Sequence, residues 1–123
     1  MLKIKSLGII GEIYNWIEDW LMDREQRVVL LGSSSDWIRV KSGVPQGSVL
    51  GPLLFLIYIN DIDDSVCNNL LKFADDTKVY SVVSNRKEIN KLQQDLHNLC
   101  NWSQDWLILF NVDKCKVMHI GFN

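Results

Sequence analysis

The spacing of apolar residues predicts two amphipathic helices, one near the N-terminus and one in the second half of the chain. Apolar side chains recur every three or four positions, with polar side chains on the opposite face. Asn85 followed by Glu88 forms a capping pair that should begin the second helix. The stripes consist of Ile10, Ile13, Trp16, Ile17, Trp20 and Leu21, and of Ile89, Leu92, Leu96, Leu99, Trp102 and Trp106. We expect these faces, tryptophans included, to pack at the core or its edge.

Strand-forming residues predict two hairpins with a helix between them. Residues 27 to 31 and 37 to 41 are rich in strand-forming side chains and flank a turn-rich connector at residues 32 to 36. Residues 70 to 83 read as a second hairpin around two adjacent aspartates. Between them, residues 49 to 59 are almost wholly apolar, and Pro52 is tolerated in a first helical turn. This run predicts a buried helix, because spanning a bilayer takes roughly 20 apolar residues.

The last part of the chain predicts strands at an edge of the domain. Residues 107 to 122 contain two short apolar runs around residues 111 to 114. The expected order of elements is a helix followed by two strands, three times over. The sequence itself contains no internal repeat and no linker. We therefore expect a mixed α+β fold in one domain over residues 1 to 123.

Composition narrows the class of protein. The chain has 123 residues, of which 47% are hydrophobic, so it can bury a core. Its net charge of -2 gives no general affinity for a polyanion, so any nucleic-acid function must rest on a local site. Cys67, Cys100 and Cys115 lack paired spacing, which indicates reduced thiols rather than disulfides. The first residues lack the apolar run of a signal peptide, so secretion is not expected.

Asp75 and Asp76 are the most distinctive candidates for chemistry. Two adjacent carboxylates at a tight turn repel each other unless a cation or hydrogen-bond donors compensate. Oxygen ligands of this kind suit Mg²⁺, which binds one or two carboxylates and completes its shell with water and phosphates. A solvated polar turn is the alternative, because aspartate is also favoured in turns for local reasons.

A second candidate is the loop from Gly43 to Gly47. Pro45 stiffens its backbone, and Gly47 allows a close approach of the backbone to a ligand. Gln46 carries an amide donor and an acceptor, which suit the minor-groove edge of a base pair. The alternative is an ordinary glycine-rich turn before a helix.

Three motifs in order carry a resemblance to a known family. They are Gly-Val-Pro-Gln-Gly at residues 43 to 47, Phe-Ala-Asp-Asp at residues 73 to 76, and Asn-Val-Asp-Lys at residues 111 to 114. With their flanks, they resemble the reverse transcriptase of non-LTR retrotransposons of the jockey-like kind, over nearly the whole chain. The resemblance implies part of the palm of a right-hand polymerase, with antiparallel hairpins packed with helices.

The resemblance also implies roles for individual residues. Asp75 and Asp76 match the catalytic, metal-binding aspartates, which hold two Mg²⁺ ions in the family. Pro45, Gln46 and Gly47 match the loop that contacts template, primer and nucleotide. Lys114 matches a lysine near the phosphates of the incoming nucleotide, a task that suits a mobile point charge. The implied partners are an RNA template, a DNA primer and a dNTP, and no membrane.

The resemblance has gaps as well. The family's first catalytic motif, which carries a further metal-binding aspartate, precedes the part that this chain matches, and the fingers and thumb also lie outside it. We therefore expect a fragment of an RNA-directed DNA polymerase, intracellular in the nucleus or cytoplasm, with an incomplete two-ion site and no activity by itself. A non-catalytic remnant that serves as a nucleic-acid-binding or interaction domain is the alternative.

Overall fold

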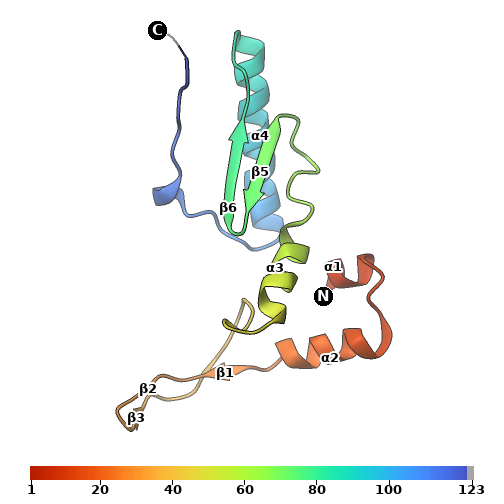
Figure 1. Ribbon diagram of the computed structural model, residues 1–123, viewed down its shortest axis with the longest axis vertical. Helices are drawn as coiled ribbons and strands as arrows, with labels where there is room; N and C mark the ends of the chain where they lie inside the picture. Colours follow the sequence, from red (N-terminus) through yellow and green to blue (C-terminus); the bar gives the residue numbers. More distant parts are fainter. Residues whose placement is uncertain (122–123) are drawn as a thin grey trace. The chain divides into compact units, whose positions relative to one another are not determined.

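The computed structural model describes residues 1–121 of the chain (Figure 1). The chain divides into two compact units, Met1–Asn60 and Asp61–Asn123. In the part of the chain that the structure describes, no helix combines the length and the apolar character needed to cross a membrane. The three cysteines are free and exposed.

Three helices build the core of the first unit: α1 (Leu2–Ser6), α2 (Gly11–Leu21) and α3 (Leu50–Ile59). Helix α2 confirms the first predicted helix, whereas α1 was not anticipated. The apolar stripe of α2 is only partly buried, since Ile10, Ile13 and Trp16 are exposed. The prediction that Trp16 packs at the core or its edge is therefore wrong. The core covers one side of α2, and Trp16 instead stacks on Trp20 with ring centroids 6.2 Å apart. The buried core consists of Ile4, Tyr14, Ile17 and Leu54.

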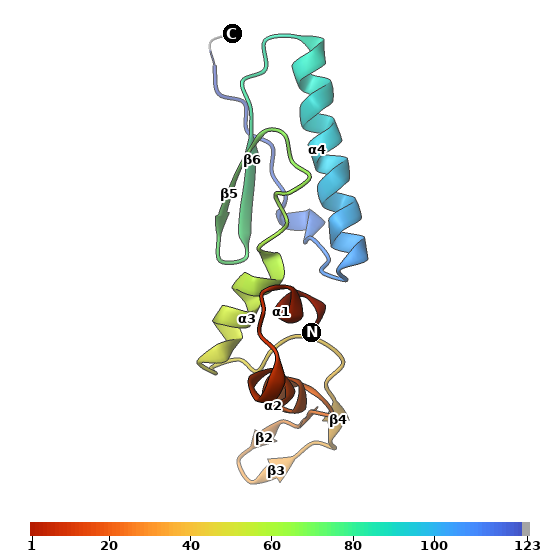
Figure 2. The ribbon, with the colours of Figure 1, turned by 90° about the vertical axis from the view of Figure 1, so that its right-hand side faces the viewer.

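The first predicted hairpin is confirmed as an arm of four short strands: β1 (Glu25–Gln26), β2 (Val29–Leu30), β3 (Ser33–Ser34) and β4 (Ile38–Arg39). Antiparallel pairing joins β1 to β4 and β2 to β3, and Figure 2 shows β2 and β3 at the end of the arm. The turn consists of Leu31 and Gly32, with φ of 49° and 82°, the left-handed pair that a tight two-residue turn requires. The turn is thus shorter than the connector expected from composition.

Helix α3 forms where the apolar run predicts it, but it is not buried on all sides. Leu54 and Ile59 are buried, whereas Leu53 and Leu56 are 52% and 54% exposed. A helix that is apolar all round needs neighbours on every side. The core of the first unit covers only the Leu54 side, so the prediction of a fully buried helix is wrong for this structure.

The second unit contains the second predicted hairpin and the long helix: β5 (Asn69–Phe73), β6 (Asp76–Tyr80) and α4 (Arg86–Asp105). The hairpin overlaps the helix in Figure 1 and lies beside it in Figure 2, so the two run alongside each other. The capping prediction is confirmed, because the Asn85 side-chain oxygen accepts hydrogen bonds from the backbone N–H groups of Lys87 and Glu88 at 3.0 and 3.2 Å. The Glu88 carboxylate reaches back to the Ser84 N–H at 2.6 Å.

The edge strands expected after α4 are absent from residues 107 to 121, which contain only the 3-10 turn η1 (Val112–Lys114). Leu107 adopts a left-handed φ of 58° and ends the helix, and the chain then turns back. Apolar runs become strands only when another strand accepts their hydrogen bonds, and the described residues provide no such pairing. Phe122, the last residue of the expected runs, lies outside the described residues. The mixed α+β class nevertheless holds, with helices and two-stranded antiparallel sheets.

Candidate functional site

The hairpin β5–β6 presents Asp75 and Asp76 at its tip. Strand pairing runs from Asn69 opposite Tyr80 to Phe73 opposite Asp76, which leaves a two-residue turn of Ala74 and Asp75. Ala74 has a φ of 51°, a left-handed conformation that costs an L-residue about 1–2 kcal/mol. Strain of this kind persists only where the surrounding structure holds it, here the paired strands. The hairpin therefore fixes the backbone of both aspartates.

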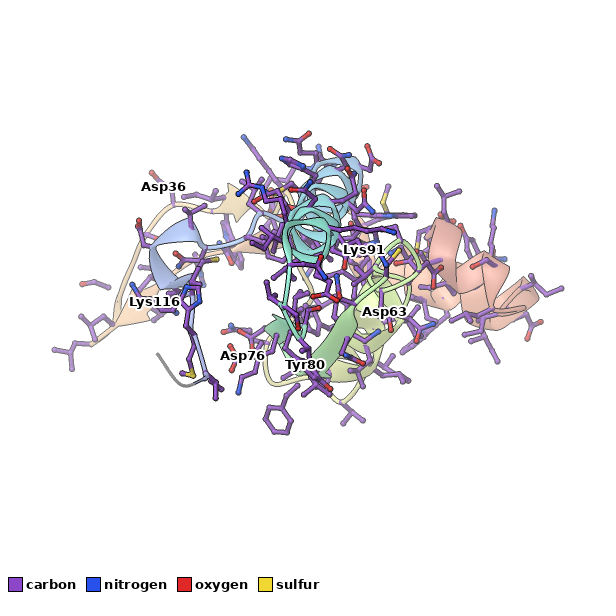
Figure 3. The ribbon with its side chains drawn as sticks, turned by 90° about the horizontal axis from the view of Figure 1, so that it is seen from above. Asp36, Asp63, Asp76, Tyr80, Lys91 and Lys116 are labelled. Atoms are coloured by element: carbon purple, nitrogen blue, oxygen red, sulfur yellow. The ribbon has the colours of Figure 1, made fainter. Side chains whose placement is uncertain are left out.

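Both carboxylates at the tip are open to solvent. Asp75 and Asp76 are both exposed, and Asp76 is labelled in Figure 3. Within residues 1–121, neither carboxylate forms an ion pair or a side-chain hydrogen bond. The compensating cation expected from the sequence is therefore not a lysine or arginine of the described chain. Nor does this part of the chain gather three or more His, Cys, Asp or Glu side chains into a group that could hold a metal ion.

A buried carboxylate anchors the other end of the hairpin to α4. Asp95 is only 1% exposed. It accepts hydrogen bonds from the backbone N–H groups of Cys67 and Asn68, both at 2.9 Å, and from the side-chain amide of Asn68 at 2.7 Å. Burial by itself raises the pKa of the Asp95 carboxyl, but these three hydrogen bonds more than offset it and hold the pKa below its ordinary value. Asp95 is therefore ionised at neutral pH.

Further polar contacts hold the segment before β5 against α4. The indole N–H of Trp102 donates to the Asp61 carboxylate at 3.0 Å, and the Asn98 amide donates to the Ser65 carbonyl at 2.6 Å. Together with Asp95, these side chains lie on one face of α4, at spacings of three and four residues. Residues 61 to 68, which we call the strap, therefore lie along that face.

An ion pair joins the strap to the hairpin near its tip. The Lys72 ammonium lies 2.6 Å from the Asp63 carboxylate. The hydrogen bond from Lys72 lowers the pKa of the Asp63 carboxyl below its ordinary value, although partial burial opposes the shift. Lys72 pairs with Thr77 across the hairpin, one step from the pair that closes the turn. The hairpin is thus tethered at its base through Asp95 and near its tip through Lys72.

The Gly43 to Gly47 loop belongs to the first unit, and it is built around Ser48. The Ser48 hydroxyl donates to the Pro45 carbonyl at 2.7 Å and accepts from the Gly51 N–H at 3.0 Å. A Cβ on Gly51 would lie 2.9 Å from the Ser48 oxygen and 3.1 Å from the Pro45 carbonyl oxygen. Gly47 has a φ of 77°, which favours glycine. The loop is therefore closely packed against the first turn of α3.

The side chain of Gln46 points out of this compact loop. Gln46 is exposed, and its amide forms no hydrogen bond within residues 1–121, so its donor and acceptor are available to a ligand. Pro45 is half-buried and Gly47 is exposed. The structure thus brings Pro45, Gln46 and Gly47 together in one loop, as it brings Asp75 and Asp76 together at the tip of one hairpin.

Lys114 ends the 3-10 turn η1 and is exposed. Its backbone N–H donates to the Asn111 carbonyl at 3.1 Å and closes that turn. Across the described residues, its ammonium forms no ion pair with Asp75 or Asp76. Lys114 and the aspartate pair therefore stand on separate elements of the second unit.

Sequence reasoning did not identify Asp95. The signal was its position, because Asp95 follows Leu92 by three residues and precedes Leu99 by four, which places a carboxylate within the apolar stripe of α4. A charged side chain on a buried face requires hydrogen-bond partners. Which partners these are depends on the strap, whose path local patterns do not reveal.

Comparisons with known proteins indicate the same family as the three motifs. Residues 2–122 match the family model described as reverse transcriptase (RNA-dependent DNA polymerase). The chain is 29% identical over 116 residues to the RNA-directed DNA polymerase from mobile element jockey of Drosophila melanogaster, covering 85% of this chain and 12% of that protein.

Two further relatives from the same organism are similar over most of the chain. The probable RNA-directed DNA polymerase from transposon BS is 31% identical over 124 residues, which cover 91% of this chain and 13% of that protein. The corresponding protein from transposon X-element is 32% identical over 119 residues, with 92% and 13% covered. The chain thus spans about an eighth of the length of these relatives. No solved structure matches it significantly.

Proposed function

The chain belongs to the reverse transcriptase (RNA-dependent DNA polymerase) family, and we propose that residues 1–123 form part of the palm of an RNA-directed DNA polymerase from a jockey-like non-LTR retrotransposon. One observation carries the proposal: two adjacent carboxylates stand exposed at the tip of a hairpin that is closed by a strained two-residue turn, in a chain that matches the family along residues 2–122. A rigid hairpin is the kind of support that a metal site requires.

The donor set at the hairpin tip fits Mg²⁺. Asp75 and Asp76 offer hard oxygen ligands without a competing lysine or arginine among the described residues, and Mg²⁺ binds one or two protein carboxylates while retaining several waters. When bound, Mg²⁺ ions would supply the positive charge that activates a primer 3′-hydroxyl and stabilises the pyrophosphate leaving group. The task of this chain is to hold the two carboxylates at the tip.

The other proposed site residues bind and orient nucleic acid and nucleotide. In the proposed enzyme, Pro45 and Gly47 shape the loop so that the Gln46 amide faces the minor-groove edge of the pair between RNA template and DNA primer. Lys114 contributes a positive charge for the phosphates of the incoming dNTP. The site of action is inside the cell, in the nucleus or cytoplasm.

Residues 1–123 alone would provide only part of the proposed metal site. The family's third metal-binding aspartate matches no residue among these 123. A polypeptide of residues 1–123 alone would thus hold Mg²⁺ through two carboxylates and bind it weakly. We propose that this polypeptide is inactive as a polymerase without that further carboxylate.

Paramagnetic broadening by Mn²⁺ tests the metal site. In a ¹⁵N-labelled chain, substoichiometric Mn²⁺ should broaden the amide signals of residues 74 to 77 first, and excess Mg²⁺ should restore them. Asp76→Asn should weaken Mn²⁺ binding about tenfold. The matched control is Asp105→Asn, which removes one exposed carboxylate from the same unit. Broadening that is spread over the surface carboxylates and unaffected by Asp76→Asn would overturn the proposal.

A further inference from the structure

We propose that Asp95 is a positioning residue, which fixes the base of the β5–β6 hairpin on α4 and thereby sets the place of Asp75 and Asp76. The inference rests on the proposed function, because it assigns Asp95 a purpose in a metal site at the hairpin tip. Asp95 itself lies at the opposite end of the hairpin from that tip. Its role is indirect and mechanical.

Asp95 occupies a place where a carboxylate is costly unless its partners are fixed. It is 1% exposed on the face of α4 that also buries Leu99 and Trp102. Each of its three donors belongs to Cys67 or Asn68, the two residues immediately before β5. A buried carboxylate is tolerated only when such hydrogen bonds satisfy it, so its geometry dictates where these two residues lie.

The contact extends from β5 to β6 through Asn68. The Asn68 amide nitrogen donates to Asp95 at 2.7 Å, while its oxygen accepts from the Ser81 hydroxyl at 2.6 Å. Asn68 directly precedes β5 and Ser81 directly follows β6, so this bridge closes the open end of the hairpin. Asp95 therefore holds both strands at their base.

Because the hairpin is long, a small rotation at its base produces a large displacement of its tip. Four residue steps separate the pair at the base, Asn69 with Tyr80, from the pair at the tip, Phe73 with Asp76. At about 3.3 Å per residue, the tip is about 13 Å from the base. A rotation of about 10° at the base would then move the tip by about 2 Å, whereas a functional constellation tolerates about 0.5 Å.

The other tether cannot replace this one. The Lys72–Asp63 ion pair near the tip is partly open to solvent, with side-chain exposures of 26% and 45%. Solvent-exposed ion pairs contribute little and yield easily. Of the two tethers, only the one at Asp95 is shielded from water and fixed by three directional hydrogen bonds.

Three variants distinguish a positioning role of Asp95 from an effect of its charge and from a general loss of folding. Asp95→Asn keeps the shape of the side chain but leaves it with one acceptor oxygen for three donors. Asp105→Asn is the matched control, because it removes the same charge from an exposed position of the same helix. The double exchange Asn68→Asp with Asp95→Asn restores the hydrogen bond between the two side chains with donor and acceptor reversed. The new carboxylate at position 68 can still accept the hydrogen bond that the Ser81 hydroxyl donates.

The position of the hairpin can be measured without a metal. A nitroxide on Cys100, an exposed residue of α4, broadens nearby amides in a chain whose other two cysteines are serine. We expect Asp95→Asn to change the broadening of residues 76 to 80 by at least twofold, with helix content by circular dichroism retained. Asp105→Asn should leave it unchanged, and the exchange variant should recover at least half of the difference.

The same variants then test the link to the metal site. We expect Asp95→Asn to weaken Mn²⁺ binding at residues 74 to 77 at least threefold, Asp105→Asn to leave it within error, and the exchange to restore it in part. An unchanged broadening pattern in Asp95→Asn overturns the inference. An exchange variant whose broadening is as far from wild type as that of Asp95→Asn also overturns it, and this holds when both variants lose their helix content. If the hairpin moves but wild-type protein binds no Mn²⁺ at its tip, the positioning stands and the proposed metal site fails.

Discussion

Replacing Gly51 with alanine should disturb the Pro45 to Gly47 loop through a contact that the structure defines. A Cβ at this position would lie 2.9 Å from the Ser48 hydroxyl oxygen and 3.1 Å from the Pro45 carbonyl oxygen. The hydroxyl cannot rotate away freely, because it bonds both the Pro45 carbonyl and the Gly51 N–H. The Pro45 carbonyl must then shift, and Gln46 and Gly47 shift with it.

The magnitude follows from two opposing effects. Overpacking a tight site costs about 1–3 kcal/mol, whereas alanine gains up to about 1 kcal/mol over glycine within a helix. We expect Gly51→Ala to lower the free energy of unfolding by about 1 kcal/mol. A loss of that size lowers the melting temperature of the chain by about 4 °C.

A double-mutant cycle with Ser48→Ala identifies the cause. Ser48→Ala by itself should cost about 1 kcal/mol, because it removes the acceptor that caps the first turn of α3. In Gly51→Ala with Ser48→Ala, the closest contact is gone, so the combined loss should fall short of the sum by about 1 kcal/mol. Urea unfolding followed by circular dichroism gives the energies, and amide shifts of Gln46 and Gly47 report the loop. Additive losses, or a stable Gly51→Ala chain with unmoved loop amides, would refute the reasoning.

Three further outcomes are expected. The pKa of Asp95 is lowered in the folded chain, so its contribution to stability should be complete above the unfolded pKa of about 4 and disappear as the pH falls through the lower folded value. The urea midpoints of wild type and Asp95→Asn should therefore converge as the pH falls from 6 to 2. Asn85→Ala should lower the free energy of unfolding by about 1 kcal/mol in the same assay, and an unchanged midpoint would argue against the cap. The polypeptide of residues 1–123 should not extend an oligo(dT) primer on poly(A) with dNTPs and Mg²⁺, and extension that disappears in Asp75→Asn would contradict this.

Elements determined by local chemistry could be predicted from the sequence. The cap at Asn85 and the β-turn chemistry around Asp75 involve residues within a few positions of one another, and both are found where expected. Burial depends on which neighbours are present, and local patterns do not contain that information. For this reason α3 and Trp16 are more exposed than their hydrophobicity suggested, and the apolar residues after Leu107 form no strand among the described residues.

The candidate site also contains residues that local sequence reveals and a residue that it does not. Asp75, Asp76 and the Pro45 to Gly47 loop were recognisable because their chemistry lies in contiguous motifs. Asp95 was missed because its partners, Cys67 and Asn68, are 28 and 27 residues away in the sequence. Support for a functional site comes from such distant contacts, so a motif search finds the tip of the hairpin but not its base.

Primer extension by a chimeric enzyme tests the central claim most directly. In the jockey polymerase of Drosophila melanogaster, the part of this chain that is similar to it would replace the corresponding segment, so that the relative supplies the remainder. We predict RNA-templated DNA synthesis that falls at least 100-fold in Asp75→Asn and in Asp76→Asn and is retained in Asp105→Asn, an exposed aspartate outside the three motifs. Synthesis that persists in the Asp75 and Asp76 variants, or a folded chimera without any synthesis, would contradict the account.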